Sequence, residues 1–147
     1  TADVDASFVS REVYQNRSEA SVLLEACSIK HMKLFCGGQA AISYVTRRDF
    51  EKCHAVKADS EALIDTLRSI AGVRVACMLR EQGDSIRGSF RAKDDTDVAA
   101  IAASFEGNEI AESFGGGGHK AAAGFSIEGP IEGALVRVEK AIEQALK

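Results

Sequence analysis

The 147-residue chain has one proline, no tryptophan and no long run of apolar residues. A transmembrane helix needs about 20 consecutive, mainly apolar residues, so we expect no membrane-spanning segment. Hydrophobic residues nevertheless make up 46% of the chain, and no low-complexity tract interrupts them. This balance predicts a folded globular domain rather than a disordered segment.

Cysteine spacings typical of disulfide or zinc sites are also missing. The four cysteines are scattered and none forms a Cys-x-x-Cys pair, which predicts reduced thiols in a cytoplasmic protein. Cys27 and His31 are four residues apart on a predicted helix, with Cys36 nearby. Because no fourth well-spaced ligand accompanies them, we favour the absence of a zinc site there.

Histidine is equally sparse. The three histidines, His31, His54 and His119, stand apart in the sequence, and no Asp-His-His triplet is present. Phosphate-ester hydrolysis at metal sites requires several Asp and His ligands that converge on the cations. The chain alone is therefore expected to bind no metal ion and to lack such hydrolytic activity.

The most informative stretch is residues 115–124, which read Gly-Gly-Gly-Gly-His-Lys-Ala-Ala-Ala-Gly. Because glycine has no Cβ, an anionic ligand can approach the main-chain amides closely. The alanines predict one or two helical turns after the glycines, and the amides at the start of a helix favour anions. A flexible linker is the alternative. The predicted anion-binding residues are Gly115, Gly116, Gly117, Gly118, His119 and Lys120.

Hydrophobic periodicity predicts a single α/β domain, with a mixed sheet of about five strands between flanking helices and a connector helix before them. Strands are expected at residues 40–46, 73–80, 85–92 and 125–127, where β-branched and aromatic residues lie between turn residues. Capping residues and apolar stripes predict helices at 17–35 (capped by Asn16), 46–53 (capped by Thr46 with Asp49), 59–72, 97–105, 109–114 and 131–146.

The predicted strands at residues 73–80 and 85–92 form a hairpin. This hairpin places several basic side chains on one face of the sheet, because side chains alternate between faces along a strand. A chain of net charge −4 can bind a polyanion only through such a local patch. The arginines of this patch are either ordinary solvated side chains or a phosphate-binding surface. Alternation assigns Arg74, Met78, Arg80, Arg87, Ser89 and Arg91 to this face, and Val73, Val75, Cys77, Leu79, Ile86 and Phe90 to the opposite one.

The glycine-rich stretch also resembles a known signature. Gly-Gly-Gly-His, a short gap and Ala-Ala-Gly, placed between a helix and a strand, is similar to the loop of the DHH-associated C-terminal domain of DHH-family phosphoesterases. This group contains RecJ-like exonucleases and NrnA-type oligoribonuclease and phosphoadenosine-phosphate phosphatases. The resemblance implies an N-terminal arm and connector helix at residues 1–38. It implies a substrate-binding domain at residues 39–147 with the glycine-rich loop at 115–118.

The same resemblance assigns roles to individual residues. Ser89-Phe90-Arg91-Ala92 is similar to a strand motif of the Ser-x-Arg-Ser type, whose arginine helps to hold the substrate phosphate, and Ala92 stands where the family usually has serine. His119 would be the catalytic residue and donate a hydrogen bond to a phosphate oxygen. The segment from Glu106 to Phe114 lengthens the family's usual short link into the loop. Substrate binding is assigned to Gly115, Gly116, Gly117, Gly118, His119, Lys120, Ser89 and Arg91.

The resemblance further implies a longer enzyme. The chain begins without methionine, and we interpret it as a fragment whose partner is its own N-terminal catalytic domain. The family's manganese ion would bind Asp and His residues of that domain, and none is expected on this fragment. The expected ligand is a short single-stranded oligonucleotide or a nucleotide phosphate. Short RNA, single-stranded DNA, cyclic-dinucleotide products and 3′-phosphoadenosine 5′-phosphate all stay open, as does a homodimer.

Two other functions remain as alternatives. One is a tRNA-binding module similar to the C-terminal domain of alanyl-tRNA synthetase, whose glycine-rich loop is followed by Arg where this chain has His119. A shift assay with tRNA against di- and trinucleotides separates this function from the phosphoesterase. The other is an oligomerisation or interaction domain that uses the long first helix. Light scattering and unaltered behaviour of a Gly117→Val variant would favour it.

Overall fold

A mixed sheet organises the domain. The computed structural model describes residues 5–106 and 120–147. Its strands are β1 (Lys33–Phe35), β2 (Ala40–Val45), β3 (Val75–Gln82), β4 (Ser85–Ala92) and β5 (Ala122–Glu128). They lie in the order β1-β2-β3-β4-β5. The β2–β3 pair is parallel, and the other three pairs are antiparallel. The predicted α/β class with five strands is confirmed.

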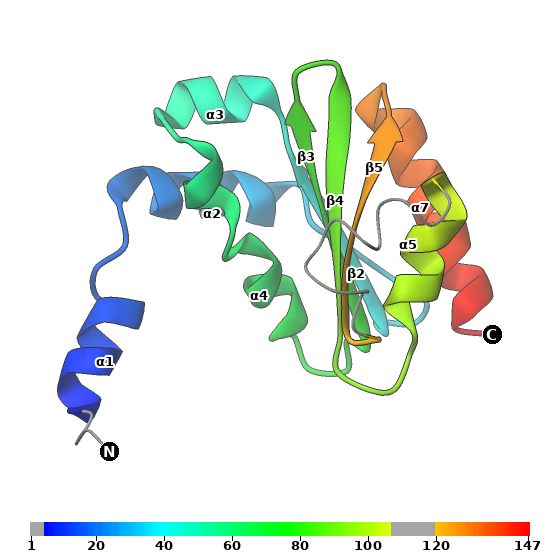
Figure 1. The fold of residues 1–147 in the computed structure, drawn as a ribbon, viewed down its shortest axis with the longest axis horizontal. Helices are drawn as coiled ribbons and strands as arrows, with labels where there is room; N and C mark the ends of the chain where they lie inside the picture. Colours follow the sequence, from blue (N-terminus) through cyan, green and yellow to red (C-terminus); the bar gives the residue numbers. More distant parts are fainter. Residues whose placement is uncertain (1–4, 107–119) are drawn as a thin grey trace.

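Helices cover both faces of this sheet. They are α1 (Ala6–Tyr14), α2 (Glu19–Lys30), α3 (Arg47–Cys53), the 3-10 helix η1 (Lys57–Ser60), α4 (Leu63–Arg68), α5 (Val98–Glu106) and α7 (Ile131–Ala145). Figure 1 shows α2, α3 and α4 on one face and α5 and α7 on the other, with α1 standing away from the sheet. The parallel crossover from β2 to β3 runs through α3, η1 and α4, so it covers the first face.

Each face of the sheet has its own hydrophobic core, because alternate side chains of the central strands point in opposite directions. The face under α5 and α7 buries, among others, Val75, Leu79, Phe90, Phe125 and Val138. The face under α2 and α4 buries, among others, Leu24, Leu63, Leu67, Ala76 and Met78. Towards β4, this second face changes from apolar to polar side chains.

Local capping explains where α3 begins. The Asp49 amide donates to the Thr46 hydroxyl at 3.1 Å, and the Thr46 amide donates to the Asp49 carboxylate at 2.9 Å. This reciprocal pair satisfies two amides that the helix itself leaves unpaired. The predicted start at Thr46 is therefore confirmed.

The first long helix is shorter than predicted. The sequence predicts it over residues 17–35 with Asn16 as its cap, but Ser18 caps α2, which ends at Lys30. Residues 33–35 form the edge strand β1 instead. A turn with positive φ at residues 36–38 reverses the chain and lets β1 pair with β2. Apolar periodicity alone did not reveal this reversal.

Two more predicted helices need correction. The helix predicted over residues 59–72 is divided into η1 and the shorter α4. The helical turns predicted after His119 do not form in residues 120–128, since Ala122 already begins β5. There the alanine backbone pairs with β4, and this pairing satisfies the amides and carbonyls that face β4. The amides after Lys120 therefore belong to a strand and not to the start of a helix.

The remaining elements follow the sequence closely. The hairpin, α5 and α7 are confirmed within about two residues of their predicted ends. The predicted turn at 109–114 lies outside the described residues. Across residues 5–106 and 120–147, none of the helices has both the length and the apolar character needed to cross a membrane.

Candidate functional site

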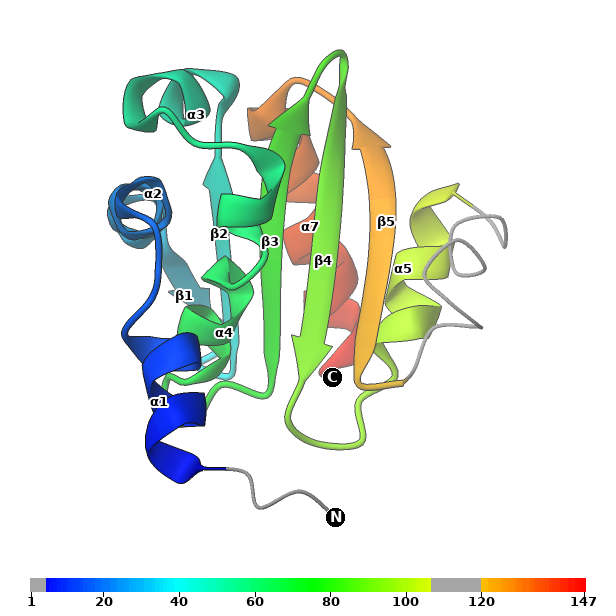
Figure 2. The same cartoon turned by 60° about the vertical axis from the view of Figure 1, so that its left-hand side comes forward.

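A cavity of about 490 Å³ lies on the sheet face that α4 covers. The β3–β4 hairpin forms its floor, and η1 with the start of α4 forms its wall. Figure 2 shows α4 in front of β3, whereas β4 has no described helix in front of it. The cavity is lined by four cationic side chains and one acidic side chain, namely Lys57, Arg80, Arg87, Arg91 and Glu61.

The register of the hairpin gathers these basic side chains. Arg80 lies directly opposite Arg87, and Met78 lies opposite Ser89. Opposite residues in an antiparallel pair point to the same face, and like charges placed opposite each other destabilise a sheet. The predicted shared face is thus confirmed for these residues and for Arg91. Sheet stability does not explain why arginines occupy it.

Arg80 is held inside this cavity rather than on its rim. The residue is only 8% exposed, and its Nη1 donates to the Ser60 hydroxyl at 2.9 Å. Burial, and then repulsion from Arg87, lower the pKa of the guanidinium, whereas Glu61 raises it. Arg87 is less buried and donates to the Ser126 hydroxyl of β5 at 2.7 Å.

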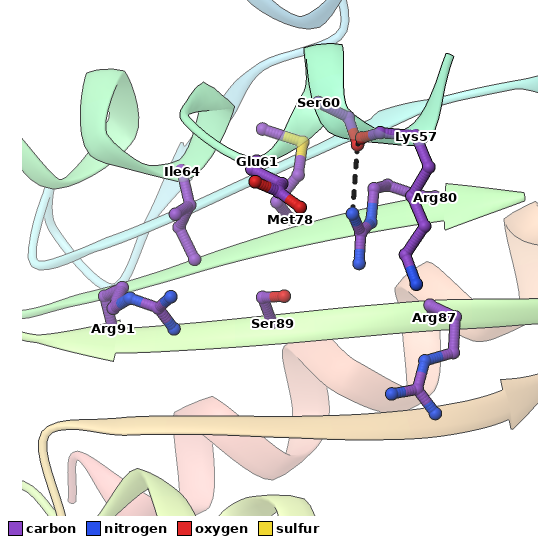
Figure 3. Close-up of a pocket in the computed structure, with 9 residues that line it drawn as sticks. All are labelled: Lys57, Ser60, Glu61, Ile64, Met78, Arg80, Arg87, Ser89 and Arg91. Carbon is purple, nitrogen blue, oxygen red and sulfur yellow. Dashed lines mark hydrogen bonds between the residues drawn. The ribbon is translucent and has the colours of Figure 1, made fainter. Parts of the chain in front are cut away.

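Ser89 and Arg91 line the cavity, where the predicted strand motif places them. Figure 3 shows Arg91 at one end, Ser89 in the middle, and Lys57, Arg80 and Arg87 at the other end. Arg91 Nη1 donates to the carbonyl oxygen of Phe90 at 2.8 Å, which orients its guanidinium. Ala92 is buried in the core under α5, so a side chain at this position does not line the cavity.

The described chain resumes at Lys120, beside the Arg91 end of the cavity. The carbonyl of Ala121 accepts a hydrogen bond from the Ala92 amide at 2.9 Å, and Ala122 lies opposite Arg91 in the sheet. Lys120 itself is exposed. The predicted loop is therefore joined to the sheet next to Arg91. Outside the described residues lie Gly115, Gly116, Gly117, Gly118, His119 and residues 107–114 of the segment before the loop.

Arg74 and Val73 do not lie where alternation predicts. Because β3 begins only at Val75, the two residues before it are not bound to the strand's alternation. Arg74 Nε donates to the Asp94 carboxylate at 2.6 Å, on the side of α5. Val73 packs in the core under α4. Three of the four predicted arginines therefore share the cavity.

The Arg74 contact gives a testable pH dependence. Hydrogen bonds from Thr96 and then Arg74 lower the pKa of Asp94 to about 2. The ionised carboxylate thus stabilises the fold fully above its unfolded pKa of about 3.9, and this contribution is lost as pH falls towards 2. Because the pair is partly exposed, we expect less than about 1 kcal/mol.

Urea unfolding from pH 6 to pH 2 measures this effect. The free energy of unfolding of Asp94→Asn is expected to fall less steeply below pH 4 than that of the unaltered chain. Asp84→Asn, an exposed change in the hairpin turn, is the matched control and should follow the unaltered chain. Parallel curves for Asp94→Asn and the unaltered chain would contradict the assignment.

Several lining residues were not predicted from the sequence. Lys57, Ser60, Glu61 and Ile64 come from the crossover, where the sequence predicted only a helix over residues 59–72 and no binding residue. The polar run before the apolar stripe of α4 is the only local signal for them. Their place in the cavity depends on the parallel crossover, which lays η1 and α4 over β3.

The cysteines and the other described histidines lie away from the cavity. All four cysteines are free, as predicted, and the sulfur atoms of Cys27 and Cys53 are 3.8 Å apart. Burial raises the pKa of Cys27 to about 11, so its thiol stays neutral. His31 stacks on Tyr44 with ring centroids 4.2 Å apart. In the part of the chain that the structure describes, no three His, Cys, Asp or Glu side chains are grouped to hold a metal ion.

Comparison with known families identifies the domain that carries this cavity. The family model described as the DHHA1 domain matches residues 37–147. The chain belongs to the DHHA1 family. This match confirms the resemblance to the DHH-associated C-terminal domain, and the matched DHHA1 region includes β2 to β5 and every lining residue of the cavity.

Individual relatives of this DHHA1 domain are longer proteins. The chain is 28% identical over 123 residues to the bifunctional oligoribonuclease and PAP phosphatase NrnA of Bacillus subtilis, covering 82% of the chain and 36% of that protein. An exopolyphosphatase-related protein of Bacteroides fragilis superposes with a TM-score of 0.80 at 30% identity, over 96% of the chain and 39% of that structure. The chain thus spans less than half the length of these relatives.

A third similarity concerns the fold alone. The pGpG-specific phosphodiesterase PggH of Vibrio cholerae superposes with a TM-score of 0.54 at 18% identity, over 97% of the DHHA1-containing chain and 43% of that structure. The arrangement of sheet and helices is therefore shared with proteins whose sequences differ widely.

Proposed function

We propose that the chain is the substrate-binding part of a longer phosphoesterase that hydrolyses short oligonucleotides or nucleotide phosphates. Arg91 and Ser89 hold the phosphate together with the loop residues Gly115, Gly116, Gly117, Gly118, His119 and Lys120. The observation that supports this most is the cationic cavity, whose Arg91 end adjoins the strand that follows the loop.

The chemistry of this end suits a phosphate oxygen. A guanidinium offers several N–H donors in a fixed plane, and a serine hydroxyl donates one more. Main-chain amides of a glycine loop can approach the same anion without interference from side chains. Together these groups would bind and orient the phosphate, while His119 donates a hydrogen bond to a phosphate oxygen as charge develops.

The metal chemistry is proposed to belong to another domain of the longer protein. The described residues offer no group of three or more metal ligands, so they do not fit a manganese site. A divalent cation bound in a separate N-terminal domain would supply the hydroxide nucleophile and neutralise charge on the phosphate. We propose that this domain is the partner of the chain, in a cytoplasmic enzyme.

The relatives support this choice of substrate. The Bacillus subtilis relative is named as both an oligoribonuclease and a PAP phosphatase, and both reactions hydrolyse a phosphate ester bond of a nucleotide. The free thiols are compatible with a reducing compartment. No described contact favours the tRNA-binding alternative over this function.

Removing the Arg91 guanidinium tests the proposed phosphate contact. A charged hydrogen bond contributes about 1.5–3 kcal/mol, so Arg91→Gln is expected to weaken binding of a 5′-phosphorylated diadenylate by roughly tenfold or more. Fluorescence anisotropy on the chain itself measures this loss. Arg68→Gln removes an equal charge from the exposed Arg68–Asp65 pair and should change the affinity less than about twofold.

Two results would count against the proposal. Equal affinity of Arg91→Gln and the unaltered chain would show that Arg91 does not contact the phosphate. A preference for tRNA over the diadenylate, unchanged in Arg91→Gln, would support the tRNA-binding alternative instead.

A further inference from the structure

The cavity contains a nearly buried cation that the proposed phosphate contact does not use. Arg80 is 8% exposed, and the Ser60 hydroxyl is its hydrogen-bond partner among the described side chains. Within residues 5–106 and 120–147, no carboxylate forms an ion pair with it. Glu61 lies on the same cavity and acts on Arg80 only as a more distant charge.

Such an arrangement is unfavourable for the chain by itself. A buried charge is normally paired, because transfer of an unpaired charge out of water costs free energy that a single neutral hydrogen bond does not restore. Arg87, directly opposite on β4, adds repulsion. Among the described side chains, Arg80 is therefore a buried cation without a carboxylate partner, and an anionic ligand at this end of the cavity would neutralise its charge.

This charge lies far from the proposed phosphate contact at Arg91. Figure 3 shows Lys57, Arg80 and Arg87 grouped at one end of the cavity and Arg91 at the other. Arg87 and Arg91 are four residues apart on β4, which at about 3.4 Å per residue is roughly 14 Å of strand. A single phosphate group cannot reach both ends.

The middle of the cavity has a different character. Ser89 lies between the two basic ends, and the apolar side chains of Met78 and Ile64 line the same space. Apolar surface between two cationic ends suits the sugars and bases that separate phosphates along an oligonucleotide. A mononucleotide with one phosphate would leave one end empty.

We propose that Arg80, with Lys57 and Arg87, binds a second phosphate of the substrate, and that the preferred ligand is an oligonucleotide with at least two phosphates. This inference rests on the proposed function only for the position of the first phosphate at Arg91. The nucleoside part of the ligand between these two phosphates lies over Ser89, Met78 and Ile64.

Binding of two ligands to the chain tests this site without any catalysis. The variant is Arg80→Met, and the ligands are 5′-AMP, with one phosphate, and a 5′-phosphorylated triadenylate. Affinity for the triadenylate is expected to fall about tenfold, as for loss of one charged contact of about 1.4 kcal/mol. Affinity for AMP should stay within about twofold, since the Arg91 end is intact. The slope of log K against log salt for the triadenylate should shrink by about 0.7.

Three controls separate binding from folding. Arg80→Met removes an unpaired buried charge, so its melting temperature is expected to equal or exceed that of the unaltered chain. Lys57→Met changes an exposed residue at the same end and should weaken triadenylate binding in the same direction. Arg68→Met changes the charge equally, outside the cavity, and should alter neither affinity.

Unchanged triadenylate binding in Arg80→Met would overturn the inference. Equal losses for AMP and triadenylate would also overturn it, because Arg80 would then support the first phosphate or the fold. Absence of any preference of the unaltered chain for triadenylate over AMP would do the same. Hydrolysis by the longer enzyme does not enter these measurements, so this inference and the proposed function can fail separately.

Discussion

Replacement of His119 by alanine is expected to lower manganese-dependent hydrolysis of a dinucleotide by well over tenfold in the longer enzyme. A tenfold loss corresponds to about 1.4 kcal/mol of barrier. Loss of one donor that stabilises charge in the transition state typically costs roughly 100- to 1000-fold in kcat. The contact strengthens as charge develops, so kcat should fall more than KM rises.

A second histidine of the chain provides the matched control. His54 is exposed, lies outside the cavity and ends α3 with a φ of 53°. Asparagine tolerates this left-handed conformation, so His54→Asn should preserve both the fold and the rate. Steady-state kinetics with a 5′-phosphorylated diadenylate would decide the matter. A rate for His119→Ala within about threefold of the unaltered enzyme would remove His119 from the proposed mechanism.

The largest effect on stability is expected from Gly88→Ala. Gly88 lies opposite Phe125 in the β4–β5 pair, and a Cβ at this position would overlap the Phe125 ring. That ring is fully buried and stacks with Phe90 and Phe105, at centroid distances of 4.8 and 5.1 Å. A shift of this ring would therefore displace the two rings that stack on it.

Overpacking of this kind costs about 1–3 kcal/mol, and we expect the upper end because three rings must shift together. For a domain of this size the melting temperature should fall by roughly 6–12 °C. Gly133→Ala is the control, since its Cβ meets nothing within 4 Å on α7, and alanine favours a helix. Thermal unfolding should show a slightly higher melting temperature for this control. Equal stability of Gly88→Ala and the unaltered chain would contradict the packing.

Alternation within strands was predictable from the sequence, and the ends of strands were not. The faces of Arg80, Arg87 and Phe90 follow directly from the two-residue period of β3 and β4. Arg74 departs from this period because β3 begins at Val75, directly after it. The ion pair of Arg74 with Asp94 depends on a tertiary contact. Local periodicity contains no information about such a contact.

Local periodicity also did not predict the outer strand β1 or the start of the other outer strand, β5. Residues 33–35 continue a helical apolar pattern, and Ala122 and Ala123 favour a helix by intrinsic propensity. Each becomes a strand because it lies beside a neighbour with free backbone groups, β2 in one case and β4 in the other. Pairing with a neighbouring strand outweighs an intrinsic preference of less than about 1 kcal/mol per residue.

The sequence singled out two candidate residues by a motif, and it did not predict the cavity in which they lie. Ser89 and Arg91 were identified from four adjacent residues, and the structure places both on the floor of the cavity. Lys57 and Ser60 meet them only because the crossover from β2 to β3 lies over the hairpin. Residues that lie together through topology leave no spacing in the sequence by which they can be recognised.

An NMR titration of the isotopically labelled chain with a 5′-phosphorylated diadenylate would locate the bound phosphate. If the phosphate lies where we propose, the largest changes in amide and guanidinium signals will occur at Ser89, Arg91, Lys120 and the glycines of residues 115–118. Signals from α7, on the opposite face of the sheet, will change little. If the largest changes instead occur on α5 and α7 and the signals of Ser89 and Arg91 do not change, the ligand binds elsewhere.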